Sequence, residues 1–101
     1  MLKDAAAIVG IGETAFAKAL APSETSLAME AILLALDDAG IDASEVDGFA
    51  SYSMETTDEV EVARNIGAGE ITFFSQVGYG GGAGPACVGQ LALAIAAGQC
   101  R

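Results

Sequence analysis

The feature that most constrains the fold is the alternation of short apolar runs with longer segments whose apolar residues recur at helical spacing. The apolar runs, bounded by glycine or polar residues, predict strands. The predicted strands cover residues 5–11, 48–53 and 71–77, and the predicted helices run from Ser23 to a cap at Gly40, over roughly 59–66 and over about 85–97. This β-α-β-α-β-α order predicts an α/β fold with a mostly parallel sheet, because parallel neighbours need a crossover helix.

The first predicted helix carries the clearest local signals. Ser23 is placed to cap its amino end, and Gly40 is placed to end it in the left-handed conformation. Leu27, Ala31 and Leu34 recur at the spacing of one helical face. These signals predict a helix with one apolar face and a sharp end at Gly40.

The composition predicts that part of the apolar surface is covered by something outside these residues. Hydrophobic residues make up 52% of the 101 residues and charged residues only 18%, which is little charge to cover the surface of so small a domain. The last predicted helix ends at Gly98, where an α/β fold would continue into its next strand. We therefore expect residues 1–101 to be a partial, incomplete domain.

Acidic residues outnumber basic ones by 14 to 4, which gives a formal net charge of -10. This balance argues against nucleic acid and anionic membranes, since both would repel the chain. No apolar run approaches the roughly 20 residues of a membrane span, and no signal-peptide layout is present, so a cytoplasmic location is expected. Metal binding is not expected, because the chain has no histidine and only two separated cysteines.

Gly10, Gly12 and Ala15 match the G-x-G-x-x-A pattern of dinucleotide-binding loops. That site needs a helix that begins at the second or third glycine, with its amino end on the pyrophosphate. Here the predicted helix begins only at Ser23, and Glu13 stands where phosphate charge would have to lie. The context therefore argues against a nucleotide site.

A second glycine-rich segment, Gly80–Gly84, lies between the last predicted strand and the last predicted helix. A P-loop would end in Gly-Lys-Ser/Thr, and no lysine or arginine lies between Asn65 and Gln99. Two interpretations stay open from the residues alone. The loop and the helix amino end could stabilise an anion or oxyanion, or the glycines could simply let the backbone pack closely.

Cys87 is the weak candidate for a catalytic nucleophile. A reactive thiol is favoured at a helix amino end beside a base, whereas Cys87 is predicted to lie one turn inside the helix of a chain without histidine. Cys87 also shares a stripe with Leu91 and Ile95, which favours a small core residue. Cys100 is a still weaker candidate.

Several segments, taken in order, resemble the opening of thiolases. They are Val9–Thr14, Ala35–Ile41, Asp47–Phe49, Thr72–Phe74 and Ala94–Gly98. These segments most resemble the sterol-carrier-protein-type thiolase-like proteins, often named lipid-transfer proteins. The segment Gly78–Gly84 is typical of that branch. The resemblance covers essentially the whole chain, and its specificity comes from the ordered set rather than from any one motif.

The resemblance implies two similar α/β halves and chemistry that makes or breaks carbon–carbon bonds in acyl-CoA thioesters. In thiolases a cysteine at the start of the third helix takes the acyl group. That position falls in Gly80–Gly82 here, where no cysteine is present, and Cys87 comes several residues too late. The resemblance therefore favours a retro-aldolase acting on steroid-derived acyl-CoA, as in relatives that lack this cysteine, over acetyl-CoA acyl transfer.

The resemblance also implies binding residues and partners. Substrate contacts are expected at the glycine loop, from Tyr79, Gly80, Gly81, Gly82 and Gly84, with coenzyme A as part of the substrate and no separately bound cofactor. A small OB-fold partner protein and a homodimer through the strand Ile71–Val77 are further expectations. Two other readings stay open: a non-catalytic lipid-transfer or acyl-CoA-binding subunit, and a truncated chain that is inactive alone.

Overall fold

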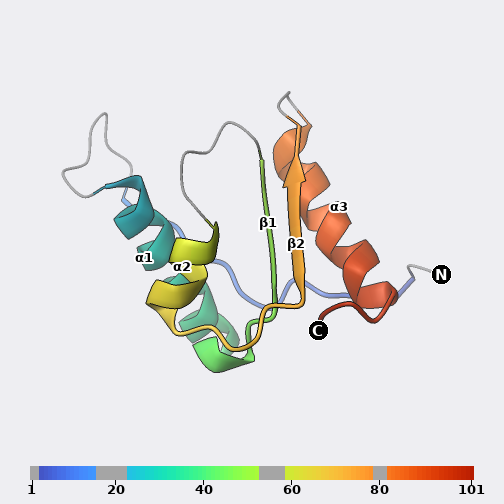
Figure 1. The fold of residues 1–101 in the computed structure, drawn as a ribbon, viewed down its shortest axis with the longest axis horizontal. Helices are drawn as coiled ribbons and strands as arrows, with labels where there is room; N and C mark the ends of the chain where they lie inside the picture. Colours follow the sequence, from blue (N-terminus) through green and yellow to red (C-terminus); the bar gives the residue numbers. More distant parts are fainter. Residues whose placement is uncertain (1–2, 16–22, 53–58, 79–81) are drawn as a thin grey trace.

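The computed structural model describes residues 3–15, 23–52, 59–78 and 82–101. Its elements are α1 (Glu24–Ala39), the short 3-10 helix η1 (Ala43–Glu45), β1 (Gly48–Tyr52), α2 (Glu59–Ile66), β2 (Phe73–Val77) and α3 (Ala83–Ala96). Figure 1 shows β1 and β2 side by side, with α1 and α2 on one side of the sheet and α3 on the other. The prediction of an α/β fold with a parallel sheet is confirmed.

Helix α1 begins and ends where its local signals predict. The Ser23 side chain accepts a hydrogen bond from the Ser26 amide, which satisfies one of the free N–H groups of the first turn. Gly40 has φ of 70°, in the left-handed region, and its N–H donates to the Asp37 carbonyl. The next amide, Ile41, donates to Leu36, which completes a Schellman motif.

The sheet consists of two parallel strands, with Gly48 opposite Phe73 and Tyr52 opposite Val77. The rings of the paired residues Phe49 and Phe74 stack with their centroids 6.1 Å apart. Since successive side chains of a strand point to opposite faces, this stack lies on the face away from the one on which β2 contacts α3 through Ser75. The crossover between the strands contains α2, as expected for a parallel pair.

The prediction of a strand at residues 5–11 is corrected by the structure, which assigns no strand there. Ile8, Val9 and Ile11 are 73%, 63% and 76% exposed. A strand requires a neighbouring ladder, and none of the described residues offers one to this segment. The segment instead crosses α1, where the Ile11 amide donates to the Asp38 carboxylate at 3.0 Å.

The other differences are small. The last strand begins at Phe73 rather than Ile71, and α3 begins at Ala83, so that Pro85 lies in its first turn. Ser53, the last residue of the second predicted strand, lies outside the described residues. The buried apolar side chains among the described residues come from α2, from α3 and from the segment after it: Val62, Ala63, Ile66, Ala94 and Cys100.

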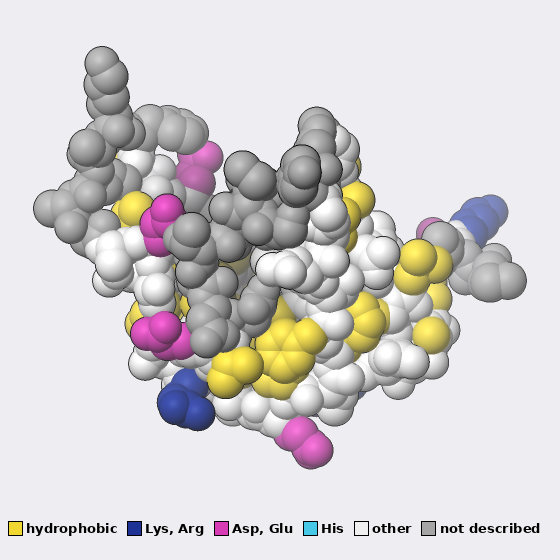
Figure 2. All heavy atoms as spheres, turned by 45° about the horizontal axis from the view of Figure 1, so that its top comes forward, with side chains coloured by type: hydrophobic (Ala, Val, Ile, Leu, Met, Phe, Trp, Pro, Cys, Tyr) yellow, Lys and Arg dark blue, Asp and Glu magenta, His cyan; other side chains and the backbone are white. Residues whose placement is uncertain are grey.

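Much apolar surface remains open. The chain exposes 6791 Å², whereas a compact monomer of 10.1 kDa would expose about 5,300 Å². On the face shown in Figure 2, apolar side chains reach the surface in several patches with few charged side chains among them. Within the described residues, no helix combines the length and apolar character that crossing a membrane requires.

Candidate functional site

The glycine-rich connection between β2 and α3 is where the predicted binding residues gather. Gly78 follows the last residue of β2, Gly82 is the residue before α3, and Gly84 lies in the first turn of α3. The predicted contacts Tyr79, Gly80 and Gly81 lie outside the described residues. The connection therefore stands at the carboxyl end of β2, the edge at which parallel α/β sheets bind ligands.

The described glycines of this connection face open space. A Cβ atom added at Gly78, Gly82 or Gly84 would have no neighbour within 4 Å among the atoms around it. Close packing against described residues is therefore not the reason for glycine at these three positions. Gly82 caps α3 without any side-chain hydrogen bond, and its carbonyl accepts from the Ala86 amide. The N–H groups of the first turn of α3 point toward the amino end of the helix, where this connection lies.

By contrast, Gly10 and Gly12 are explained by packing. An added Cβ at Gly10 would collide with the Ala35 carbonyl of α1, and one at Gly12 would collide with the Ala31 carbonyl. No helix begins at these glycines, since α1 starts only at Glu24. The residues that match a dinucleotide fingerprint thus allow an extended segment to lie directly on α1.

A hydrogen bond joins the two elements on either side of the glycine connection. The Ser75 hydroxyl, in the middle of β2, lies 3.2 Å from the side-chain oxygen Oε1 of Gln90 on α3. Sequence reasoning missed this pair. The available signal was that Gln90 is the one long polar side chain in an otherwise apolar helix. This contact restrains α3 relative to the strand that precedes the loop.

The recess beside the carboxyl half of β2 is small and partly polar. It is lined by Val60 of α2 and by Phe74, Ser75 and Gln76 of β2. Phe74 remains 47% exposed although one side of its ring is covered by Phe49. The Phe74 ring and the Gln76 side chain lie on one face of β2, whereas the Ser75 hydroxyl points to the other face, toward Gln90. An apolar ring with a nearby amide suits a ligand that carries both apolar and hydrogen-bonding groups.

The two cysteines are free and differ in their surroundings. Cys87 is half-buried in the second turn of α3, where no described base accompanies it. Cys100 is only 8% exposed, and burial, followed by the negative charge of Asp47, raises the pKa of its thiol. A thiol held protonated is a poor nucleophile, so these surroundings do not favour a nucleophilic role for Cys100.

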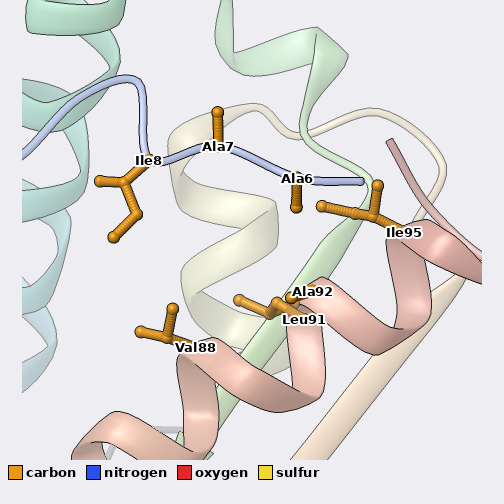
Figure 3. Close-up of a pocket in the computed structure, with 7 residues that line it drawn as sticks. All are labelled: Ala6, Ala7, Ile8, Val88, Leu91, Ala92 and Ile95. Atoms are coloured by element: carbon orange, nitrogen blue, oxygen red, sulfur yellow. The ribbon is translucent and has the colours of Figure 1, made fainter. Parts of the chain in front are cut away.

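An apolar recess of about 300 Å³ lies between residues 6–8 and α3. Figure 3 shows the extended residues Ala6–Ile8 crossing above α3. The helix contributes Val88, Leu91, Ala92 and Ile95. Because these side chains are all aliphatic, the recess can bury apolar groups but offers no side chain for acid–base chemistry. Among the described residues, no group of three or more histidine, cysteine or carboxylate side chains could hold a metal ion.

Comparison with known proteins shows which proteins this chain is similar to. No protein-family model matches it. It is 52% identical over 98 residues to a steroid side-chain-cleaving aldolase of Thermomonospora curvata and, to the same extent, to a 17-hydroxy-3-oxo-4-pregnene-20-carboxyl-CoA lyase of Mycobacterium tuberculosis. Each match covers 97% of this chain and 25% of the relative. The chain therefore spans about a quarter of the length of these relatives.

Two solved structures share its fold. A Ltp2-ChsH2(DUF35) aldolase matches with a TM-score of 0.89 and 51% identity, over 93% of this chain and 25% of that one. A monomeric SCP2-thiolase-like protein of Mycobacterium smegmatis matches with a TM-score of 0.75 and 31% identity, over 92% of this chain and 21% of that one. The chain is thiolase-like. The resemblance noted at Asp47–Phe49, Thr72–Phe74 and the glycine loop of this thiolase-like chain thus reflects a shared fold.

Proposed function

We propose that this thiolase-like chain is part of an enzyme that cleaves a carbon–carbon bond of a steroid side chain by a retro-aldol reaction on an acyl-CoA thioester. The observation that carries the proposal is 52% identity over nearly the whole chain to two proteins, both named for this kind of cleavage. The absence of cysteine from Gly80–Gly82 supports it, because aldol cleavage needs no acylated nucleophile.

The reaction balances without an additional reactant. The substrate carries a hydroxyl on the carbon β to the thioester carbonyl. A base removes the hydroxyl proton, the bond between the α and β carbons breaks, and the hydroxyl carbon becomes a ketone. The electron pair passes to the thioester as an enolate, which is protonated at its α carbon to release a shorter acyl-CoA. Catalysis therefore requires a base, an acid and stabilisation of the enolate oxygen.

The contribution we assign to this chain is binding and stabilisation at the glycine connection. Gly82 and Gly84 have no side chain to block a thioester from the first turn of α3, whose N–H groups favour developing negative charge. Tyr79, Gly80 and Gly81 are proposed to complete this surface. Coenzyme A enters as part of the substrate. We assign the acid and base to residues outside this chain, which has no histidine.

The experiment is a chimera that replaces the matching residues of the Thermomonospora curvata aldolase with this chain. We expect the purified chimera to convert a 17-hydroxy-20-carboxyl-CoA steroid into a ketone and a shorter acyl-CoA. Chromatography and mass spectrometry measure the two products. The parent enzyme is the positive control, and this chain alone is the negative control. A chimera that folds like the parent but only binds the thioester would instead support the non-catalytic subunit.

Acyl transfer is separated from aldol cleavage in the same assay. Thiolysis would consume free coenzyme A and pass through an acyl group on a cysteine, which intact-protein mass spectrometry detects. We expect no such adduct, and we expect a Cys87→Ala chimera to retain cleavage. Loss of activity in Cys87→Ala, together with an acyl adduct on Cys87 in the unaltered chimera, would replace aldol cleavage by acyl transfer.

Two protein partners belong to this proposal. An OB-fold partner is supported by the similarity to the Ltp2-ChsH2(DUF35) aldolase. A homodimer through Ile71–Val77 is supported by β2, which pairs with β1 along one edge and has no strand along its other edge among the described residues. The Mycobacterium smegmatis neighbour is called monomeric. Sedimentation of the chimera and of its Phe74→Asp variant decides between these states, since a dimer through β2 should dissociate in the variant.

A further inference from the structure

The residue just before β1, Asp47, makes hydrogen bonds to a segment 54 residues further along the chain. Both of its carboxylate oxygens lie 3.1 Å from the Arg101 amide nitrogen and accept its N–H. Hydrogen bonds from a backbone N–H to a carboxylate are stronger than those between neutral groups. The Asp47 carboxylate therefore serves as the acceptor for the Arg101 N–H, a role that a backbone carbonyl plays between paired strands.

The same place joins the beginnings of both strands. The Asp47 carbonyl accepts the Thr72 amide at 2.8 Å and the Phe73 amide at 3.2 Å. The Thr72 hydroxyl in turn donates to the carbonyl of Gln99, two residues before Arg101. The segment that leaves α3 is thus held to the start of β1 by the Asp47 side chain and to the start of β2 by the Thr72 hydroxyl.

Between these two attachments lies Cys100. It is buried, and its sulfur would be 3.0 Å from a Cβ atom added at Gly48. The absence of a side chain at Gly48 therefore lets residues 99–101 lie directly against the first residue of β1. Backbone contact, a buried side chain and two separate hydrogen-bonded attachments all converge on this segment.

We propose that Asp47 is a backbone clamp, meaning that its carboxylate holds residues 99–101 against the amino ends of both strands and thereby fixes the position of this segment relative to the sheet. The inference is independent of the proposed function. The clamp requires the carboxylate of Asp47 specifically. An asparagine of the same shape would offer one acceptor oxygen and would turn an NH₂ donor toward the Arg101 amide.

The test measures hydrogen exchange of the Arg101 amide by NMR in the unaltered 101-residue chain and in Asp47→Asn, with Ala94 in α3 as an internal reference. We expect exchange at Arg101 to accelerate by about tenfold or more in the variant, while exchange at Ala94 changes less. Asp42→Asn is the matched control, because the hydrogen bonds of Asp42 go to the neighbouring residues Ser44 and Glu45, and the substitution should leave Arg101 unchanged.

Two further measurements keep the clamp testable in folded protein. A scalar coupling across the hydrogen bond, between the Arg101 amide nitrogen and the Asp47 carboxylate carbon, is expected in the unaltered chain. Thr72→Val should accelerate exchange at Cys100 and Arg101 less than Asp47→Asn does, since it removes only the second attachment. Equal exchange at Arg101 in the unaltered chain and Asp47→Asn, or the absence of that coupling, would overturn the clamp.

Discussion

The two ends of the parallel sheet are built in opposite ways. At the amino end, Asp47 and Thr72 bind the segment after α3, and Cys100 fills the space beside Gly48. At the carboxyl end, a Cβ atom added at Gly78, Gly82 or Gly84 would have no neighbour within 4 Å. One end is closed by contacts between distant parts of the chain, whereas at the other end the described glycines have no close neighbour.

The amino end of the sheet is suited to stabilise the fold, and the carboxyl end is suited to bind a ligand. Hydrogen bonds over 25 residues or more give a closed end that resists local opening, since several distant segments must separate together. Open glycines contribute little packing, so their use must be sought in backbone shape and access. Variants at the two ends should therefore have opposite signatures, with stability changing at one and activity changing at the other.

The largest effect in this comparison is expected from Gly48→Ala at the closed end. The added Cβ would lie 3.0 Å from the Cys100 sulfur and 3.2 Å from its Cβ, so Cys100 must shift. We expect the free energy of unfolding in urea to fall by about 1–2 kcal/mol. In a Cys100→Ala background, Gly48→Ala should lower the free energy of unfolding by less, because the Cys100 sulfur, the atom nearest to the added Cβ, is absent. Equal costs in the two backgrounds would show that the contact with Cys100 does not set the effect.

A smaller effect, which depends on pH, is expected from the Cys100 thiol. Burial and the charge of Asp47 raise the pKa of this thiol above its ordinary value, so the folded chain holds its proton more tightly than the unfolded chain. That contribution to stability is fully present below the thiol pKa of the unfolded chain, about 8.5, and is lost as the pH rises from there toward the folded pKa. Urea midpoints between pH 7 and pH 10 measure it.

The matched variant for this pH dependence is Cys100→Ala. It lowers the midpoint at every pH by removing a buried side chain, but we expect its curve to be flatter than that of the unaltered chain above pH 8.5. Parallel curves for the two proteins would mean that another group causes the decline. The closed end would then be stabilised by packing and hydrogen bonds alone.

Local signals predicted most of the fold. Ser23 and Gly40 bound α1 because capping depends on a few neighbouring residues, and β2 was found because aromatic and β-branched residues form a short bounded run. Residues 5–11 have the same composition as a buried strand. The prediction failed there because a strand also needs a neighbour to pair with, which a pattern within seven residues cannot supply.

The contacts that distinguish the two ends were not predictable in the same way. Asp47 and Arg101 are separated by 54 residues, and Ser75 and Gln90 by 15, so no periodicity connects them. A glycine run directly before the last helix was predicted, because such a run before an apolar helix is a local pattern, although α3 begins early enough to include Gly84. Whether those glycines face a neighbour or open space depends on tertiary structure, which only the coordinates reveal.

The smallest effect on stability, and the sharpest on activity, is expected from Gly84→Ala at the open end. Gly84 lies in the first turn of α3 with no atom near an added Cβ, so alanine should stabilise the chain by about 0.5–1 kcal/mol. Gly89→Ala, in the same helix with equally open surroundings, should give a similar gain in stability.

In the chimera, Gly84→Ala should lower steroid-CoA cleavage by about tenfold or more, because a methyl group would stand between the thioester and the helix amino end. Gly89→Ala should leave cleavage unchanged. Equal activity of the two variants would show that the open end is merely unpacked, and the thioester would then have to bind elsewhere.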